Sequence, residues 1–354
     1  MYPLAEGLFA PVNQWYVAGF VEEIGRGPIE RYVLDEPVVL YRRLDGSPVA
    51  LSGHCPHRHF PLARGKLVGD ELQCAYHGIR FAPDGRCMRV PTQAVAPAAC
   101  KVRPYPVVDC GPWTWIWPGE RSLADPQLIP AAVRSGDHEH YRIPVKQHHY
   151  VRGRYMLLHD NLLDLSHLEY LHASGIGSEG GSTVPETRSE GPGWVSSERY
   201  QASTPCPPYF QDVFEYRGLV QRRFGMTCHV PSILIGFDHF ARAMTPEDSS
   251  GSSLGKFLVY HAITPARRHE THYFVAAGRD FALESDELSS AMSAALANTV
   301  GEDIAATEGI EGIVGGLSKG PVDVLVQGDL NCVRGRRLFE SMIRAECNHS
   351  ANPV

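Results

Sequence analysis

Two short segments of the chain each pair a thiol with an imidazole. Cys55 and His57 are separated by one residue, Cys74 and His77 by two, and sixteen residues lie between the segments. Two thiolates and two imidazoles can bind zinc, but zinc sites usually pair Cys with Cys at two to four residues. A two-iron cluster takes both thiolates on one iron and both imidazoles on the other, so each segment supplies one ligand to each metal. The spacing therefore favours a [2Fe–2S] cluster over zinc.

Two further histidines, His54 and His59, flank the first segment. The spacing favours His57 as the ligand, and we expect the other two to be surface or supporting residues. We expect the histidine edge of the site to face solvent, because imidazole can hydrogen-bond outward while the thiolates stay buried.

A second group of polar residues lies on the first stretch with convincing helical periodicity. Asn161, Asp164 and His167 are three residues apart, which predicts that they share one helix face. His172 follows five residues after His167, about 140° around an ideal helix. Both imidazoles therefore reach one ion only if the helix ends or distorts near Tyr170. The alternative is a polar helix face with two unrelated histidines.

Asp303 supplies a third candidate ligand from a second helical region, about residues 286–313. It lies on a largely apolar stripe with Met292, Leu296, Thr299, Thr307 and Ile310. A carboxylate buried there is costly unless it is paired or bound to a metal. Its neighbour Glu302 falls off the stripe and is expected to be solvated. Two histidines and one carboxylate form the ligand set of mononuclear non-haem Fe(II) sites; a simple buried hydrogen bond to Asp303 is the alternative.

These two groups need different scaffolds, and the sequence supplies them in turn. Short strand-like runs, broken by Gly, Pro and the turn pair Asp45-Gly46, predict a small all-β domain over residues 10–120. Residues 121–145 contain several Pro and Gly and indicate a connector. Residues 146–354 combine the helical regions with strand-like runs at 194–200, 213–222, 232–240, 256–264 and 269–277. This combination predicts an α+β domain with helices flanking an antiparallel sheet.

The first helical stretch spans residues 154–171 and is followed by a Gly-, Ser- and Pro-rich segment at 174–193. We expect this segment to be a mobile loop. Residues that contact substrate are expected on it and on the strands between 213 and 277.

Composition excludes some classes of function. The chain has 33 Lys and Arg against 40 Asp and Glu, a net charge of −7, which argues against a nucleic-acid-binding surface. No stretch approaches the roughly 20 apolar residues of a membrane span, and no basic leader precedes an apolar run, so we expect a soluble, cytoplasmic protein without a membrane partner. No dinucleotide-binding motif and no plant-type ferredoxin motif is found, so a redox enzyme of this sequence needs an external electron source.

The cysteine–histidine segments resemble the motif of the Rieske [2Fe–2S] domain. All four ligand positions are matched, by Cys55, His57, Cys74 and His77. Asp164, His167 and His172 resemble the D-x2-H-x4-H motif of the Rieske non-haem iron oxygenases. Glu302-Asp303 is similar to the Glu-Asp pair of that family, although Ile304 stands where Lys often follows. The resemblance extends over nearly the whole chain, including Trp15-Tyr-Val-Ala and the order of the two domains.

Within the family, the chain looks most similar to the two-domain monooxygenases of the vanillate O-demethylase and dicamba monooxygenase group. The run His261-Ala-Ile-Thr-Pro, followed by His272-Tyr-Phe, resembles a stretch of that group in which the first histidine lines the substrate pocket. The resemblance implies a helix-grip catalytic domain, a [2Fe–2S] cluster, a mononuclear Fe(II) and O2 as cosubstrate. It assigns His167, His172 and Asp303 to the Fe(II).

The resemblance also implies how electrons travel. Asp164 would bridge His167 of one subunit and His77 of a neighbour in a head-to-tail homotrimer, a heterologous interface that closes into a ring. Asn161 would orient the site.

The implied function is that of an oxygenase component that oxidises a small aromatic substrate with O2 and with electrons from a separate flavin reductase, a ferredoxin, or both. NAD(P)H would act only indirectly, through the reductase. We expect O- or N-demethylation or another dealkylation, in which hydroxylation of an alkyl carbon gives an unstable product that loses formaldehyde. The alternatives are hydroxylation or cis-dihydroxylation of an aromatic ring, and a Rieske electron-transfer protein without oxygenase activity.

Overall fold

The computed structural model describes residues 4–5, 7–134, 141–244, 251–317 and 323–351. The chain divides into two units, each with its own core. One unit falls within residues 10–136 and 264–268, and the other within residues 1–9, 137–263 and 269–354. No helix in the described part of the chain is long and apolar enough to cross a membrane.

The first unit is built from eleven short strands. They are β1 (Tyr16–Phe20), β2 (Ile29–Val33), β3 (Glu36–Arg42), β4 (Pro48–Ser52), β5 (Lys66–Val68), β6 (Glu71–Gln73), β7 (Arg80–Phe81), β8 (Cys87–Arg89), β9 (Pro104–Tyr105), β10 (Val107–Cys110) and β11 (Trp113–Ile116). They form three sheets, with the orders β1-β11-β10, β2-β3-β4-β9 and β5-β6-β7-β8. The expected all-β domain is confirmed.

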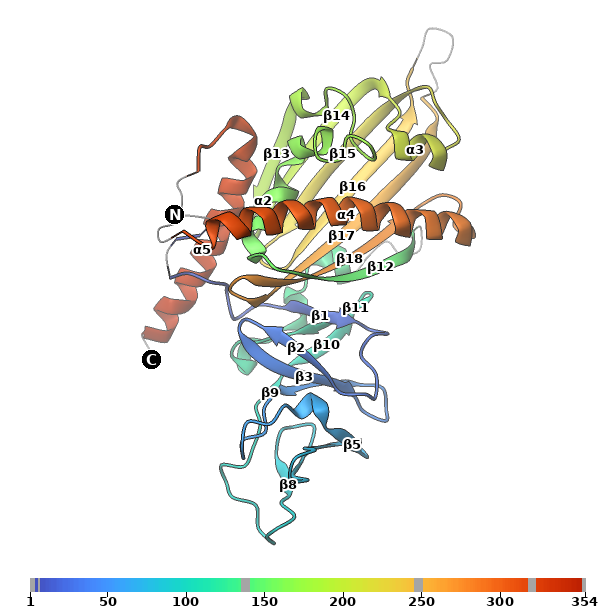
Figure 1. Ribbon diagram of the computed structural model, residues 1–354. Coiled ribbons are helices and arrows are strands. Elements are labelled where there is room, and N and C mark those ends of the chain that lie inside the picture. The colour runs from blue at the N-terminus through green and yellow to red at the C-terminus, as the bar shows by residue number, and fades with distance from the viewer. Residues whose placement is uncertain (1–3, 6, 135–140, 245–250, 318–322, 352–354) are drawn as a thin grey trace. The chain divides into compact units, whose positions relative to one another are not determined.

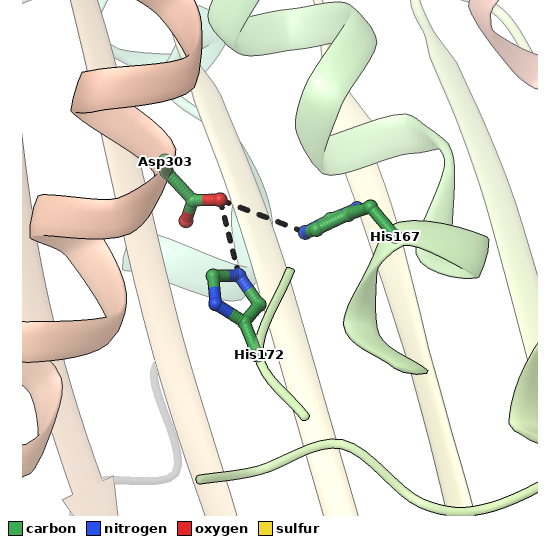
Figure 2. Close-up of side chains that lie close together, drawn as sticks. All are labelled: His167, His172 and Asp303. Carbon is green, nitrogen blue, oxygen red and sulfur yellow. Dashed lines mark hydrogen bonds and ion pairs between the residues drawn. The ribbon is translucent and has the colours of Figure 1, made fainter. Parts of the chain in front are cut away.

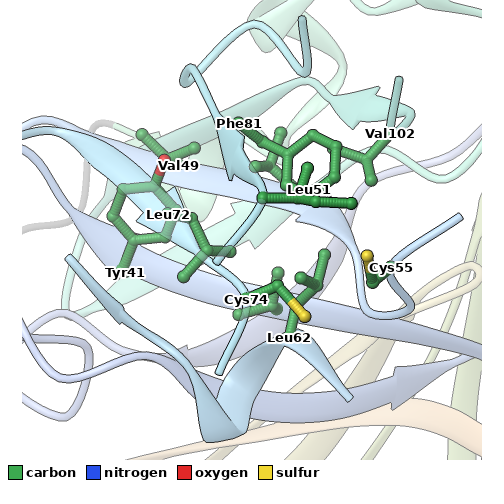
Figure 3. Packing of buried hydrophobic residues seen from close by; sticks show 11 residues of the cluster. Tyr41, Val49, Leu51, Cys55, Leu62, Leu72, Cys74, Phe81 and Val102 are labelled. Atoms are coloured by element: carbon green, nitrogen blue, oxygen red, sulfur yellow. The ribbon is translucent and has the colours of Figure 1, made fainter. Parts of the chain in front are cut away.

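A shared core joins the last two of these sheets (Figure 3). Tyr41 and Leu51 from the β2-β3-β4-β9 sheet pack with Phe81 from the β5-β6-β7-β8 sheet, and Cys55 and Cys74 lie in the same cluster. Each thiol therefore belongs to a loop but is buried in the hydrophobic core.

The second unit is centred on a seven-stranded sheet, in the order β12-β18-β17-β16-β15-β14-β13. The strands are β12 (Arg142–Val151), β13 (Glu186–Gly191), β14 (Trp194–Pro205), β15 (Leu219–His229), β16 (Ile233–Arg242), β17 (Ser253–Arg267) and β18 (Glu270–Arg279). The registered neighbours pair antiparallel. Alternate residues of β15, from Val220 to Cys228, are buried, as expected for a sheet covered on one face.

Four α-helices accompany this sheet. They are α2 (Tyr155–Leu163), α3 (Pro208–Val213), α4 (Asp286–Val314) and α5 (Leu330–Ala351). The long helix α4 lies across one face of the sheet (Figure 1) and contacts α2, which in turn contacts α5. Ser285 caps the start of α4 by accepting a hydrogen bond from the backbone N–H of Leu288. The expected α+β architecture and second helical region are confirmed.

The structure differs from the sequence-based expectation in several segments. The helix expected over 154–171 ends at Leu163, and a 3-10 helix, η4 (Leu165–Glu169), follows. Residues 208–213 form α3, so the strand expected at 213–222 begins only at Leu219. Residues 121–145, expected to be a connector, include the short helix α1 (Ala131–Arg134) and the start of β12. The helix α5 was not predicted.

The segment 174–193 is more ordered than the mobile loop expected from its composition. It contains a 3-10 helix, η5 (Gly181–Thr183), and the strand β13. The carboxylate of Glu169 accepts hydrogen bonds of 2.9 Å from the backbone N–H groups of Gly180 and Ser182 and thereby holds the turn before β13.

Candidate metal centres

Three side chains from two elements converge in the second unit (Figure 2). His167 and His172 come from the segment after α2, and Asp303 comes from α4. Oδ1 of Asp303 lies 3.1 Å from Nε2 of His172 and 3.6 Å from Nε2 of His167. One ligand atom from each residue lies within 4.8 Å of the other two. Such a group suits a single divalent metal ion.

The end of α2 allows the two imidazoles to meet. Asp164 leaves the helix with φ −103° and ψ 90°, and its carboxylate caps η4 by accepting a 3.0 Å hydrogen bond from the backbone N–H of Ser166. His167 therefore lies on a 3-10 turn, and the expectation that Asn161, Asp164 and His167 share one helix face is wrong. The helix does break, as both imidazoles require, but at Asp164 and not near Tyr170.

Hydrogen bonds fix the orientation of both rings. Nδ1 of His167 donates to the backbone carbonyl of Asp164 at 2.6 Å, and Nδ1 of His172 donates to Oε2 of Glu302 at 2.5 Å. With Nδ1 of each ring held by these hydrogen bonds, Nε2 faces Asp303 and can bind a metal ion through its lone pair once it carries no proton. Glu302 was expected to be solvated; its side chain is 40% exposed, yet its carboxylate orients His172.

The charges around the site favour a bound cation. Burial lowers the pKa of His167, and the carboxylate of Asp303 only partly offsets this. Burial acts in the same direction on His172, but the hydrogen bonds and charges of Asp303 and Glu302 prevail and raise its pKa. Asp303 is buried on its helix, where a divalent ion would compensate the carboxylate. Imidazole and carboxylate donors fit Fe(II).

Asp164 and Asn161 lie near the site in different environments. The carboxylate of Asp164 is half-buried, and a Cβ atom on Gly328 would lie 3.3 Å from its Oδ1. Oδ1 of Asn161 is buried and accepts no hydrogen bond from the described residues. Asn161 does not line the cavity beside the metal ligands.

A cavity of about 120 Å³ opens beside the three candidate ligands. Most of its wall is apolar, with Leu162, Ile176, Phe224, Met226, Val259 and Leu296 among the lining residues. From the segment 174–193 only Ile176 contributes, while the strands β15, β16 and β17 contribute half of the other lining residues. Such a wall suits a ligand with a large apolar surface.

His261 lies in the wall of this cavity, and its ring is held by Tyr273. Nδ1 of His261 lies 2.6 Å from the hydroxyl oxygen of Tyr273, and both residues are buried. Burial lowers the pKa of His261 to about 4, so the ring is neutral near pH 7. When the buried hydroxyl of Tyr273 donates to Nδ1, the ring proton resides on Nε2, which makes Nε2 a hydrogen-bond donor.

The four residues of the first motif also come together. Cys55 and Cys74 are buried, whereas His57 and His77 are exposed, with their ring centroids 4.6 Å apart. The expected burial of the thiols and exposure of the imidazoles is confirmed. Burial raises the pKa of the Cys55 thiol to about 11, so the thiolate needs a nearby metal charge. Two buried thiols beside two exposed imidazoles fit a Rieske cluster.

The two loops around this site have the same backbone hydrogen bonds. The N–H of His59 donates to the carbonyl of Cys55 at 2.8 Å, and the N–H of Gly78 donates to that of Cys74 at 3.0 Å. Both donor residues have a positive φ, 55° at His59 and 70° at Gly78. His59 therefore closes a turn in the backbone, and His54 forms an isolated β-bridge with Pro61.

Sequence reasoning missed several residues around the catalytic cavity. Tyr273 lies on β18, and the ion pair of buried Arg222 with partly exposed Asp238 lies on β15 and β16. The pairing of these strands in the sheet cannot be read from the sequence. Asp238 carried a signal, because Leu234, Gly236 and Phe240 make its face of β16 otherwise apolar.

Known families and proteins match both parts of the chain. The Rieske [2Fe-2S] domain matches residues 14–106, and the vanillate O-demethylase oxygenase C-terminal domain matches residues 151–345. The dicamba O-demethylase oxygenase component of Stenotrophomonas maltophilia is 33% identical over 302 residues, which cover 84% of this chain and 87% of that protein. The vanillate O-demethylase oxygenase subunit of Pseudomonas sp. (strain HR199 / DSM 7063) is 32% identical, with 83% and 84% covered.

The fold agrees with these matches. The crystal structure of dicamba monooxygenase bound to 3,6 dichlorosalicylic acid superposes with a TM-score of 0.86 at 31% identity, covering 95% of this chain and 98% of that chain. The shared cofactors are a Rieske [2Fe–2S] cluster and a non-haem iron, with O2 as cosubstrate. The chain belongs to the Rieske non-haem iron oxygenases of the vanillate O-demethylase group and is the oxygenase component of a multicomponent monooxygenase.

Proposed function

We propose that the protein removes a methyl or other alkyl group from the oxygen or nitrogen of a small aromatic substrate. The observation that carries the proposal is the apolar cavity beside His167, His172 and Asp303, with the neutral donor His261 in its wall. Relatives named dicamba O-demethylase, vanillate O-demethylase and chloroacetanilide N-alkylformylase favour dealkylation over ring hydroxylation.

In this proposal His167, His172 and Asp303 hold Fe(II), which supplies the chemistry of O2 activation when bound. The apolar walls hold the aromatic ring and exclude water. The Nε2–H group of His261 orients a substrate oxygen so that the alkyl carbon faces the metal ligands. Hydroxylation of that carbon gives a hemiacetal or hemiaminal, which breaks its C–O or C–N bond to release the dealkylated product and a carbonyl compound, formaldehyde when the group is methyl.

Cys55, His57, Cys74 and His77 are proposed to hold the cluster, which receives electrons from a separate reductase or ferredoxin. The edge formed by His57 and His77, beside Tyr76 with 56% exposure, is exposed and favours contact with another chain.

The path from the cluster to the catalytic metal is proposed to cross between subunits of a homotrimer. Asp164 lies beside a segment whose apolar side chains are exposed, including Val324 at 91%, Leu325 and Val326. Such a surface next to a half-buried carboxylate suits a partner subunit that presents His77. Val326→Glu should convert the trimer to smaller species in analytical ultracentrifugation, and an unchanged trimer would argue against this interface.

No disulfide links any of the nine cysteines, all of which lie in the described part of the chain; this fits a reducing compartment, and we propose a cytoplasmic location.

The direct test is a screen of aryl methyl ethers and N-methyl anilines with a surrogate reductase, following formaldehyde and O2 uptake. Formaldehyde released in proportion to O2 consumed is the expected result. Hydroxylated product without formaldehyde would overturn the proposal. Asp303→Ala distinguishes an oxygenase from a Rieske electron-transfer protein. In an electron carrier this variant would keep its iron content and its electron transfer, whereas in an oxygenase it loses the mononuclear iron and forms no product.

A further inference from the structure

A buried ion pair lies at one end of the cavity. Asp238 on β16 accepts from Arg222 on β15 through Nε at 3.0 Å and Nη2 at 2.5 Å. In the register of β16 and β17, Leu234 pairs with His261 and Asp238 pairs with Phe257. Four residues of strand separate Leu234 from Asp238, which is about 13 Å. The charges of Asp303 and His167 act on His261, so His261 marks the metal end and Asp238 the opposite end.

Arg222 is fully engaged and is not available to a ligand. Its Nη1 donates to the carbonyl of Ile176 at 2.9 Å and lies 3.1 Å from Oγ of Ser178. Its guanidinium carbon lies 4.6 Å from the ring centroid of Phe224 and 5.3 Å from that of Phe240. The side chain is only 1% exposed, whereas that of Asp238 is 16% exposed and lines the cavity. The ion pair therefore offers acceptor oxygens to the cavity, and no cationic group.

The remaining polar groups of the cavity do not supply a cation either. Besides the three candidate metal ligands, the titratable residues in its described lining are Arg222, Asp238 and His261. His261 is neutral and Arg222 is bound to Asp238. An anionic substrate would bring a second negative charge close to Asp238, and no free cationic group of the described lining would compensate that charge.

We infer that the cavity selects an uncharged, elongated aromatic substrate whose far end donates an O–H or N–H hydrogen bond to Asp238. The inference rests on the proposed function for the identity of the metal end. A para-substituted ring carries its alkyl ether and its donor at opposite ends, so that the ether can face the metal ligands while the donor faces Asp238. Aromatic carboxylates are disfavoured.

The test measures binding to the full-length oxygenase with both metal centres loaded, without O2 and with the cluster oxidised, by isothermal titration calorimetry. Four probes differ in one feature each: 4-methoxybenzyl alcohol, 4-methylanisole, 4-methoxybenzoate and 2-methoxybenzyl alcohol. The first should bind at least about tenfold more tightly than each of the others, because a hydrogen bond to a charged acceptor is stronger than one between neutral groups.

Two variants assign the preference to the ion pair. Asp238→Asn alone would leave the buried guanidinium of Arg222 without its counter-charge. Both residues are therefore replaced, by Arg222→Met and Asp238→Leu, so that apolar side chains fill the space of the ion pair. This double variant should bind 4-methoxybenzyl alcohol and 4-methylanisole equally. Arg223→Gln is the control, since Arg223 pairs with Glu198 on the exposed face of the same strand, and it should keep the wild-type preference.

Three results would overturn the inference. The benzoate could bind as tightly as the alcohol, or the alcohol could show no measurable binding. The double variant could also keep the preference for 4-methoxybenzyl alcohol over 4-methylanisole. If the double variant fails to fold, the four probes still decide with the wild-type protein. Formaldehyde release is scored separately: demethylation of the benzoate instead of the alcohol would contradict this inference and leave the proposed dealkylation intact.

Discussion

Nδ1 of His172 donates a hydrogen bond of 2.5 Å to the carboxylate of Glu302, the residue next to Asp303 on α4. One turn of helix thus carries both the carboxylate proposed to bind the metal and the carboxylate that orients a second ligand. Because the two side chains point in different directions from the helix, Asp303 meets Nε2 of the ring while Glu302 meets Nδ1.

Glu302→Gln should weaken Fe(II) binding about tenfold, because the amide can accept from Nδ1 but removes the negative charge that supports the imidazole. Competition with a chelator measures the affinity, and the visible spectrum of the cluster should not change. Glu287→Gln, in the exposed first turn of the same helix, is the matched control. Equal iron affinity in all three proteins would show that Glu302 does not support the site.

Asp164→Asn should retain both metal centres and slow the reoxidation of the reduced cluster by the catalytic site. His167 is held by the backbone carbonyl of residue 164, and asparagine can still accept from the N–H of Ser166. Loss of one charge-assisted hydrogen bond, about 1.5–3 kcal/mol, corresponds to a rate lower by about 10- to 100-fold. Stopped-flow spectroscopy in a single turnover measures this rate. Loss of the cluster in this variant would refute the bridging role.

Local spacing was sufficient to predict that the four residues proposed to hold the cluster come together, because each pair lies within one tight loop. Asp303 was also predictable, since a carboxylate on an apolar helix stripe requires a partner. Of the stripe expected on α4, Met292 and Thr307 are buried, but Ile310 is exposed and Glu311 is buried instead, where it pairs with Arg154.

Features that depend on contacts between distant segments were not predictable. Glu302 gains its partner only when residue 172 folds against α4, 130 residues away. The leucines that follow Asp164 continue a helical pattern, so the break of α2 depends on the packing of η4 and not on local propensity. Segment 174–193 has the composition of a loop, but pairing with β14 makes part of it a strand.

Tyr273→Phe should leave the fold and iron content intact and weaken substrate binding by about five- to tenfold, near 1 kcal/mol. Without the phenol, neutral His261 no longer has a donor at Nδ1, and the proton can move from Nε2 to Nδ1. Calorimetry with the preferred substrate measures the affinity, and His261→Ala should show a similar or larger loss. If Tyr273→Phe binds substrate as the wild type does while His261→Ala does not, the phenol has no part in orienting the ring.

His159→Phe should make the protein less sensitive to acid. His159 is buried against Tyr155 and Phe339, and burial lowers its pKa to about 3. Its pKa in the unfolded chain is about 6.5, so the unfolded state binds a proton that the folded state excludes, and stability falls as the pH drops below that value. Between pH 7.5 and pH 5.5 the loss from this residue is about 1.4 kcal/mol in the free energy of unfolding. Urea unfolding at both pH values measures this loss.

Other buried histidines add to the total loss of stability, so only the difference between wild type and variant is diagnostic. Phenylalanine fills a similar volume and should reduce the pH-dependent loss by about 1.4 kcal/mol. An identical loss in both proteins would mean that His159 is protonated in the folded state or that its ring is hydrated.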